Sequence, residues 1–183
     1  MVETQELKLN LGSRDRHIPG FKSIDINSEF AEQRASISDL WMYKTGSVSE
    51  IYCSHALEHL PHKYTLDTLK EWHRLLKPGG ILYVAVPDFE RTVELYLKTK
   101  AEGIGLTDWA VNFLWGDQGY KEAFHYAGFD FLRLRKLLFA AGFSEASQVE
   151  FFPIGDPKDC SHLRSTIDAK PISLNVIAVK GDA

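Results

Sequence analysis

Hydrophobic and polar positions alternate in short runs along the first third of the chain, and such runs predict β-strands. Residues 7–12 (Leu-Lys-Leu-Asn-Leu-Gly) alternate and end on a glycine, and residues 23–26 and 48–54 are two further short apolar runs. The pair Pro19-Gly20 predicts a turn between the first two runs. The segment joining these two runs is too short and too interrupted by proline and glycine for an ordinary crossover helix.

Later in the chain the apolar residues recur every three or four positions, which is typical of helices. Residues 63–76 show this spacing, and Pro78-Gly79-Gly80 is expected to end the helix. Residues 130–141 form a second amphipathic pattern, with Gly142 as the expected C-terminal cap. Residues 89–100 are also predicted to be helical.

The most apolar and β-branched segment is 81–87 (Ile-Leu-Tyr-Val-Ala-Val-Pro), which suits a strand buried on both faces of a parallel sheet. Residues 147–152 and 174–179 predict a closing pair of strands. Strands that alternate with helices predict one α/β domain over residues 1–183, with a Rossmann-like, doubly wound, mostly parallel sheet and an antiparallel closing strand. Residues 101–128 are aromatic-rich and are expected to be irregular.

Composition narrows the class of protein further. The chain has 183 residues, of which 44% are hydrophobic and 25% charged, and its net charge is −4. It therefore lacks the broad basic field of a non-specific nucleic-acid binder. Two cysteines cannot form a disulfide framework, the first residues do not resemble a signal peptide, and no apolar run is long enough for a membrane span. These features predict a cytoplasmic protein.

Ligands of such sheets bind beyond the carboxyl ends of the strands, so polar residues at those ends are the first candidates. Gly12 ends the first strand and lets a ligand approach the backbone, while Asp25 ends the next strand and is placed to accept hydrogen bonds from a ribose diol. Arg14 replaces the second glycine of a dinucleotide fingerprint, and no helix N-terminus follows to hold a pyrophosphate. A dinucleotide-dependent oxidoreductase is therefore disfavoured, and a cofactor without phosphates is favoured.

Five segments of the chain, in the same order, resemble the class I S-adenosylmethionine-dependent methyltransferases of the small type 11 group. Together they span roughly half of the chain, and the last two are the most specific. The segments are LNLGS (9–13), IDI (24–26), SDL (38–40), IYCSHALEH (51–59) and LKEWHRLLKPGGILYVAVPD (69–88).

This resemblance implies S-adenosylmethionine as the methyl donor and implies a role for the first two strand ends. Gly12 and Ser13 would lie under the methionine and ribose portion of the donor, and Asp25 would bind the ribose hydroxyls. Arg14 departs from the family pattern and would shift the tight loop, cover the entrance or weaken the affinity for the donor.

The later strand ends receive roles from the same resemblance. Asp39, together with Leu40, would contact the adenine, and the carboxylate would accept a hydrogen bond from the exocyclic amine. Ser54 and His55 would line the pocket near the sulfonium.

The segment His55-Ala-Leu-Glu58-His59 also fits the H-x-x-E-H pattern of zinc proteases. That chemistry needs both histidines on one face of a well-formed helix and a third ligand downstream. Here the motif follows a strand end, and Pro61 limits any helix that begins in it. No metal site is predicted.

Two side chains are the candidates for catalysis. Asp88, which ends the 81–87 strand, either binds substrate or caps the next helix. His125 either packs in its loop or contacts the substrate as a general base, because an imidazole titrates near neutrality. Residues 89–128 are expected to form an aromatic-rich lid over the acceptor.

The leading interpretation is an enzyme that transfers a methyl group from S-adenosylmethionine to a small or medium-sized acceptor. An oxygen nucleophile on a metabolite, a sugar or a lipid-linked intermediate is expected. Displacement at the sulfonium carbon requires mainly positioning, and a base only where the acceptor must lose a proton. The alternative is a non-catalytic S-adenosylmethionine-binding sensor or partner subunit of the same fold, which Arg14 and the short first crossover keep open.

Overall fold

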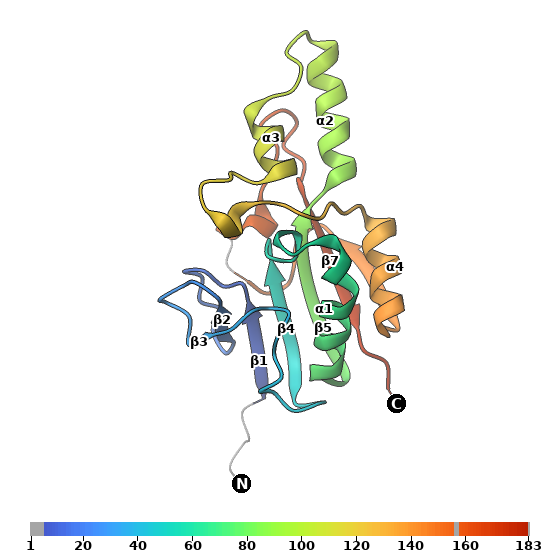
Figure 1. Cartoon of the computed structure of the whole chain (residues 1–183). Coiled ribbons are helices and arrows are strands. Elements are labelled where there is room, and N and C mark those ends of the chain that lie inside the picture. Colours follow the sequence, from blue (N-terminus) through green and yellow to red (C-terminus); the bar gives the residue numbers. More distant parts are fainter. Residues whose placement is uncertain (1–5, 156–157, 183) are drawn as a thin grey trace.

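A mostly parallel sheet forms the centre of the protein, as the computed structural model of the chain shows for residues 6–155 and 158–182 (Figure 1). Within these residues the seven strands stand in the order β3-β2-β1-β4-β5-β7-β6. Strands β1 to β5 pair in parallel, and β7 runs antiparallel to both β5 and β6. The strands are β1 (Leu7–Leu11), β2 (Lys22–Asp25), β3 (Gln33–Arg34), β4 (Val48–Ser54), β5 (Leu76–Pro87), β6 (Glu145–Val149) and β7 (Ser173–Val179).

The three predicted helices are present, and their ends differ from the prediction by at most two residues. They are α1 (Thr65–Leu75), α2 (Phe89–Ala101) and α4 (Phe131–Ala141). Asp130 caps α4 by accepting a hydrogen bond from the backbone N–H of Arg133 at 2.7 Å. Gly142 closes the helix in the left-handed conformation, with φ of 108°, as its sequence position predicted.

The expectation that residues 101–128 are irregular was wrong in part, because they include a helix, α3 (Asp108–Trp115). The hydroxyl of Thr107 caps α3 by accepting from the N–H of Ala110 at 3.3 Å. Apolar and aromatic side chains occupy most positions of this short helix, so the sequence shows no clear period of three or four. The structure also adds β3, a two-residue strand that pairs with β2.

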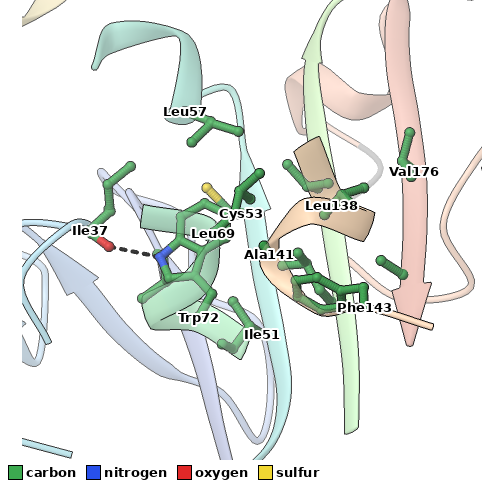
Figure 2. Packing of buried hydrophobic residues seen from close by; sticks show 14 of the residues in the cluster. Ile37, Ile51, Cys53, Leu57, Leu69, Trp72, Leu138, Ala141, Phe143 and Val176 are labelled. Carbon is green, nitrogen blue, oxygen red and sulfur yellow. Dashed lines mark hydrogen bonds between the residues drawn. The ribbon is translucent and has the colours of Figure 1, made fainter. Parts of the chain in front are cut away.

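Helices α1 and α4 pack side by side on one face of the sheet and cover its larger core (Figure 1). Every second side chain of the strands points to this face, including Ile51 and Val176, and meets Trp72 of α1 and Leu138 of α4 (Figure 2). The indole Nε1 of fully buried Trp72 donates to the carbonyl of Ile37 at 2.7 Å. The helix face of the sheet is therefore tied to the loop that precedes β4.

Loops and the short 3-10 helix η4 (Cys160–His162) cover the opposite face of the sheet. Phe152 packs edge-on against Tyr52 of β4 and Tyr83 of β5, with ring centroids 5.6 Å apart in both pairs. The second layer of helices that a doubly wound sheet implies is thus reduced here. The links between the first four strands are too short, and too rich in turn residues, to fold into helices.

The carboxyl ends of β1, β2, β4 and β5 meet at one edge of the sheet, and α2 and α3 rise above that edge (Figure 1). This is the edge at which ligands of parallel sheets bind. Among the residues that the structure describes, no helix combines the length and the apolar character needed to cross a membrane.

Candidate active site

Gly12 closes β1 with a left-handed turn whose φ is 68°. The backbone N–H groups of Gly12 and Ser13 both donate to the carbonyl of Ile24, at 2.8 and 3.2 Å. A Cβ atom at position 12 would lie 2.4 Å from the Cβ of Ala56. Glycine is needed here because the segment after β4 packs directly against this loop.

Arg14 occupies the position of the second glycine and takes the left-handed conformation that a glycine would take, with φ of 46°. This conformation costs a residue with a Cβ about 1–2 kcal/mol. The N–H of Arg14 donates to Oδ2 of Asp25 at 2.9 Å, and its carbonyl accepts from the hydroxyl of Ser28. The tight loop is therefore retained despite the arginine.

Asp25 lies at the end of β2 beside this loop and is 8% exposed. Its Oδ1 accepts from the backbone N–H groups of Asn27 at 2.8 Å and Ser28 at 2.9 Å, while Oδ2 accepts from Arg14. A carboxylate offers about four acceptor positions. About one position thus remains on Oδ2, enough for a single ribose hydroxyl.

Ser13 is the second residue of this loop region with a polar group available to a ligand. Its side chain is buried, and its Oγ has no hydrogen-bond partner within residues 6–155 and 158–182. A buried hydroxyl without a partner in the protein is unusual and indicates a ligand or a water molecule. The Ser13 hydroxyl and the open position on Asp25 both fit a polar cofactor at this edge.

Asp39 and Leu40 lie on the loop between β3 and β4, which α1 holds in place. Asp39 is exposed and available to an adenine amine, whereas the side chain of Leu40 is fully buried in the helix-face core. Any contact from Leu40 would therefore come from its backbone. Arg74 of α1 donates to the carbonyls of Tyr43 at 3.1 Å and Leu40 at 3.5 Å.

Ser54 and His55 end β4 in the middle of the edge. The hydroxyl of Ser54 donates to the carboxylate of Asp159. His55 has φ of 49°, its Nε2 lies 2.8 Å from the hydroxyl of Ser173, and its ring centroid lies 6.0 Å from that of Phe113. These contacts connect the end of β4 with β7 and with α3.

A hollow of about 270 Å³ opens beyond β5, bordered by α2, α3 and the loop that leads to α4. A wider depression of about 510 Å³ adjoins it and shares Phe89 and residues 126–128 with it. Every lining residue of the two hollows falls between positions 62 and 133, so the Gly12 loop lines neither of them. The side chains that face the smaller hollow include Phe89, Phe113, Trp115, His125 and Tyr126.

His125 is held against α3 at the wall of the smaller hollow. Its backbone N–H donates to the carbonyl of Trp115 at 3.1 Å, and its Nδ1 lies 3.0 Å from the carbonyl of Phe113. Because a carbonyl only accepts, Nδ1 carries the proton and Nε2 carries the lone pair in the neutral ring. Burial lowers the pKa of His125 below its ordinary value and so favours the neutral ring. Glu58 has the opposite, smaller effect on this pKa.

Asp88 caps α2, which was one of its two predicted roles. Its Oδ1 accepts from the backbone N–H of Arg91 at 3.1 Å. Burial raises the pKa of Asp88 above its ordinary value. Its neighbours Pro87 and Phe89 line the smaller hollow, so a substrate-binding role for Asp88 stays a prediction.

A cluster of titratable side chains that the sequence did not predict lies beside the hollow. Glu58, which is 0% exposed, is grouped with His59 and His125, and one nitrogen or oxygen atom from each lies within 4.8 Å of the others. Burial raises the pKa of Glu58, but His55, His59 and His125 outweigh this effect, so the net shift is downward. His125 comes from a distant part of the chain, so only the folded structure reveals the group.

The helical H-x-x-E-H arrangement of zinc proteases is not formed at this motif. His55 precedes a three-residue 3-10 helix, η1 (Leu57–His59), and the chain is extended again at Leu60. The backbone of His55 is also in the left-handed conformation, so His55 is not part of a helix. The two histidines of the motif are therefore not presented on one helical face.

Comparison with known proteins shows which proteins have a similar sequence segment and a similar fold. Residues 19–84 match the family model described as Methyltransferase domain. A search of curated proteins gives no match to this chain.

Three solved structures illustrate the similarity of fold. A SAM-dependent methyltransferase from Methanosarcina mazei has 20% identity and a TM-score of 0.60, over 96% of this chain and 92% of that one. One from Archaeoglobus fulgidus has 12% identity and a TM-score of 0.63, over 96% and 86%. The 1,6-didemethyltoxoflavin-N1-methyltransferase of Burkholderia thailandensis, solved with 1,6-didemethyltoxoflavin and S-adenosylhomocysteine, has 14% identity and a TM-score of 0.55, over 96% and 71%.

The family-model match over residues 19–84 and the shared fold are both consistent with an S-adenosylmethionine-dependent methyltransferase. The resemblance noted in the sequence is thereby confirmed, and S-adenosylmethionine is the implied methyl donor. The unpartnered hydroxyl of Ser13 and the open acceptor position of Asp25 are compatible with this cofactor.

Proposed function

We propose that the enzyme methylates an oxygen nucleophile of a small or medium-sized acceptor that binds in the hollow beyond β5. The observation that carries the proposal is the placement of His125. Its Nδ1 donates to the carbonyl of Phe113, and its ring lines that hollow. Hydroxyl groups of metabolites, sugars and lipid-linked intermediates are an acceptor class that requires such a base. The cytoplasmic location expected from the sequence belongs to the same proposal.

S-adenosylmethionine supplies a methyl group bonded to a sulfonium sulfur, which is a good leaving group. Asp25 would accept a hydrogen bond from one ribose hydroxyl, and Ser13 would hydrogen-bond the polar methionine portion. Asp39 would accept from the adenine amine, with Leu40 contributing backbone contacts. The Gly12 loop, Ser54 and His55 would complete the donor pocket at the strand ends.

On the acceptor side, the chain's residues would position the hydroxyl and remove its proton. As the new oxygen–carbon bond forms and the sulfur–carbon bond breaks, the hydroxyl proton would pass to Nε2 of His125. General-base catalysis of this kind contributes about 10²–10⁴-fold to the rate. Residues 89–128, with α2 and α3, would act as the lid that excludes water from this transfer.

The proposal is tested with calorimetry and a methyl-transfer assay. We expect S-adenosylhomocysteine to bind in a 1:1 ratio and to raise the melting temperature, because a ligand that binds only the folded state stabilises it. NAD should do neither. Radiolabelled methyl groups should then appear on hydroxylated acceptors in preference to matched amines.

Two outcomes would contradict these expectations separately. An unchanged melting temperature at millimolar S-adenosylhomocysteine would remove the donor assignment. Donor binding combined with label found only on amines would overturn the choice of oxygen and leave the donor site intact.

Trp115 gives a direct test of the lid. The side chain is 48% exposed and lines the hollow, so it is not a core anchor. We expect Trp115→Ala to lower acceptor turnover selectively, with an unchanged affinity for S-adenosylhomocysteine. Its stability loss should stay below the roughly 3–5 kcal/mol typical of a buried tryptophan.

Melting temperature, donor affinity and turnover would be measured on the same Trp115→Ala protein. A large loss of stability without a selective loss of turnover would show that Trp115 supports the fold and does not act as part of a lid.

A further inference from the structure

We propose that Glu58, His59 and His125 bind one divalent transition-metal ion, such as Zn²⁺, beside the acceptor hollow. The three residues come from η1 and from the loop that follows α3, and one ligand atom from each lies within 4.8 Å of the others. Two imidazoles and one carboxylate are a known ligand set for zinc and for other first-row transition metals.

The buried carboxylate is the first observation that points to a cation. Glu58 is 0% exposed, and neither of its carboxylate oxygens has a hydrogen-bond partner among the described residues. The imidazole of His55 lies beside this carboxylate, with Nδ1 3.3 Å from Oε1. A buried carboxylate is unfavourable unless it is paired or bound to a metal ion.

The two histidines are held in the way that metal-binding histidines usually are. The Nδ1 atom of His59 lies 3.1 Å from the carbonyl of Phe124, and that of His125 lies 3.0 Å from the carbonyl of Phe113. Metal-binding histidines commonly donate their second ring N–H to a backbone carbonyl in this manner, which fixes the ring and the tautomer. The two rings pack edge to face, with their centroids 4.8 Å apart.

The peptide backbone also fixes the carboxylate relative to the loop that carries His125. The carbonyl of Glu58 accepts from the N–H groups of Tyr126 at 2.8 Å and Ala127 at 3.2 Å. These bonds anchor η1 to the residues directly after His125, so the ligand set is organised before an ion binds. Nitrogen ligands favour a transition metal over Mg²⁺ or Ca²⁺, which prefer oxygen.

The effect of the ion on catalysis rests on the proposed function, whereas the binding of the ion does not depend on that function. The lone pair of His125 cannot hold a proton and a metal ion at the same time. An ion in this position would therefore remove His125 from its proposed role as a base, and the metal content would control acceptor methylation.

The experiment uses the full, untagged chain after treatment with a chelator, and it needs no acceptor. We expect calorimetry with ZnCl₂ to give one ion per chain, and Co²⁺ to give the visible absorption of an ion bound to nitrogen ligands. Glu58→Gln, His59→Gln and His125→Gln should each weaken zinc binding by at least about tenfold. His73→Gln is the matched control, because His73 is a half-buried histidine at the end of α1, on the opposite edge of the sheet.

Circular dichroism and melting temperature would establish that each variant folds, and the two histidine variants still test the site if Glu58→Gln does not fold. Absence of stoichiometric zinc binding by the wild-type chain would overturn the proposal. Wild-type zinc affinity in both Glu58→Gln and His125→Gln would overturn it as well. S-adenosylhomocysteine titrations on the same samples separate this result from the fate of the proposed methyl transfer.

Discussion

Replacing His125 with glutamine is expected to slow methyl transfer by about 10²–10⁴-fold while the affinity for S-adenosylhomocysteine stays unchanged. Glutamine keeps a polar side chain of similar reach in contact with the carbonyl of Phe113 but cannot accept the acceptor's proton. Turnover and donor affinity would be measured on the same preparation, with His73→Gln as the matched control. Equal turnover in His125→Gln and the wild type would show that another group accepts the proton.

The pH dependence of kcat/KM in the wild-type enzyme also tests the proposed role of His125. Because burial lowers the pKa of His125 below 6.5, the base form persists to lower pH than it would for an exposed histidine. The acid limb of kcat/KM should therefore lie below 6.5 and should disappear in His125→Gln. The free energy of unfolding should also fall as the pH falls below 6.5. The reason is that His125 takes up its proton more readily in the unfolded chain than in the folded one.

Asp25→Ala is expected to lower the affinity for S-adenosylhomocysteine by about 10–150-fold. A charge-assisted hydrogen bond to a ribose hydroxyl contributes about 1.5–3 kcal/mol, and each 1.4 kcal/mol is about tenfold in affinity. The substitution also removes the acceptor for three backbone N–H groups, so the melting temperature should fall as well. Calorimetry below the new melting temperature measures the affinity of the folded fraction.

Two control variants separate the lost ribose contact from damage to the loop. Ser28→Ala removes the bond to the carbonyl of Arg14 but leaves the carboxylate of Asp25 intact, so it reports the contribution of loop order alone. Asp39→Ala should cost less than Asp25→Ala, since Asp39 is exposed and an adenine contact there is partly solvated. A folded Asp25→Ala protein with wild-type affinity would place the ribose elsewhere.

The sheet could be predicted from the sequence wherever the apolar residues show a clear pattern. Strands β1, β2, β4 and β5 coincide with alternating or continuous apolar runs, and the helices coincide with the period of three to four. Strand β3 could not be predicted, because its two polar residues are extended only through pairing with β2. Helix α3 was missed because apolar residues occupy most of its surface.

The residues at the strand ends were easier to place from the sequence than those beside the hollow, for a related reason. Asp25 and Ser54 each end a strand, and parallel strands bring their carboxyl ends to one edge. Glu58 and His125 belong to segments without a regular pattern, and their proximity depends on how the loop after α3 returns to η1. That return is fixed by tertiary hydrogen bonds, such as those to the carbonyl of Glu58, which leave no signal in the sequence.

Arg74 and Trp72 tie α1 to the loop that carries Asp39. Their side chains donate hydrogen bonds to backbone carbonyls of that loop. Any ligand or substitution that shifts α1 changes the free energy of ordering this loop. If the methyl donor binds at Asp39 as proposed, its occupancy would alter α1 by the same coupling free energy. The outer surface of α1 would then be a place from which the affinity for the donor is regulated.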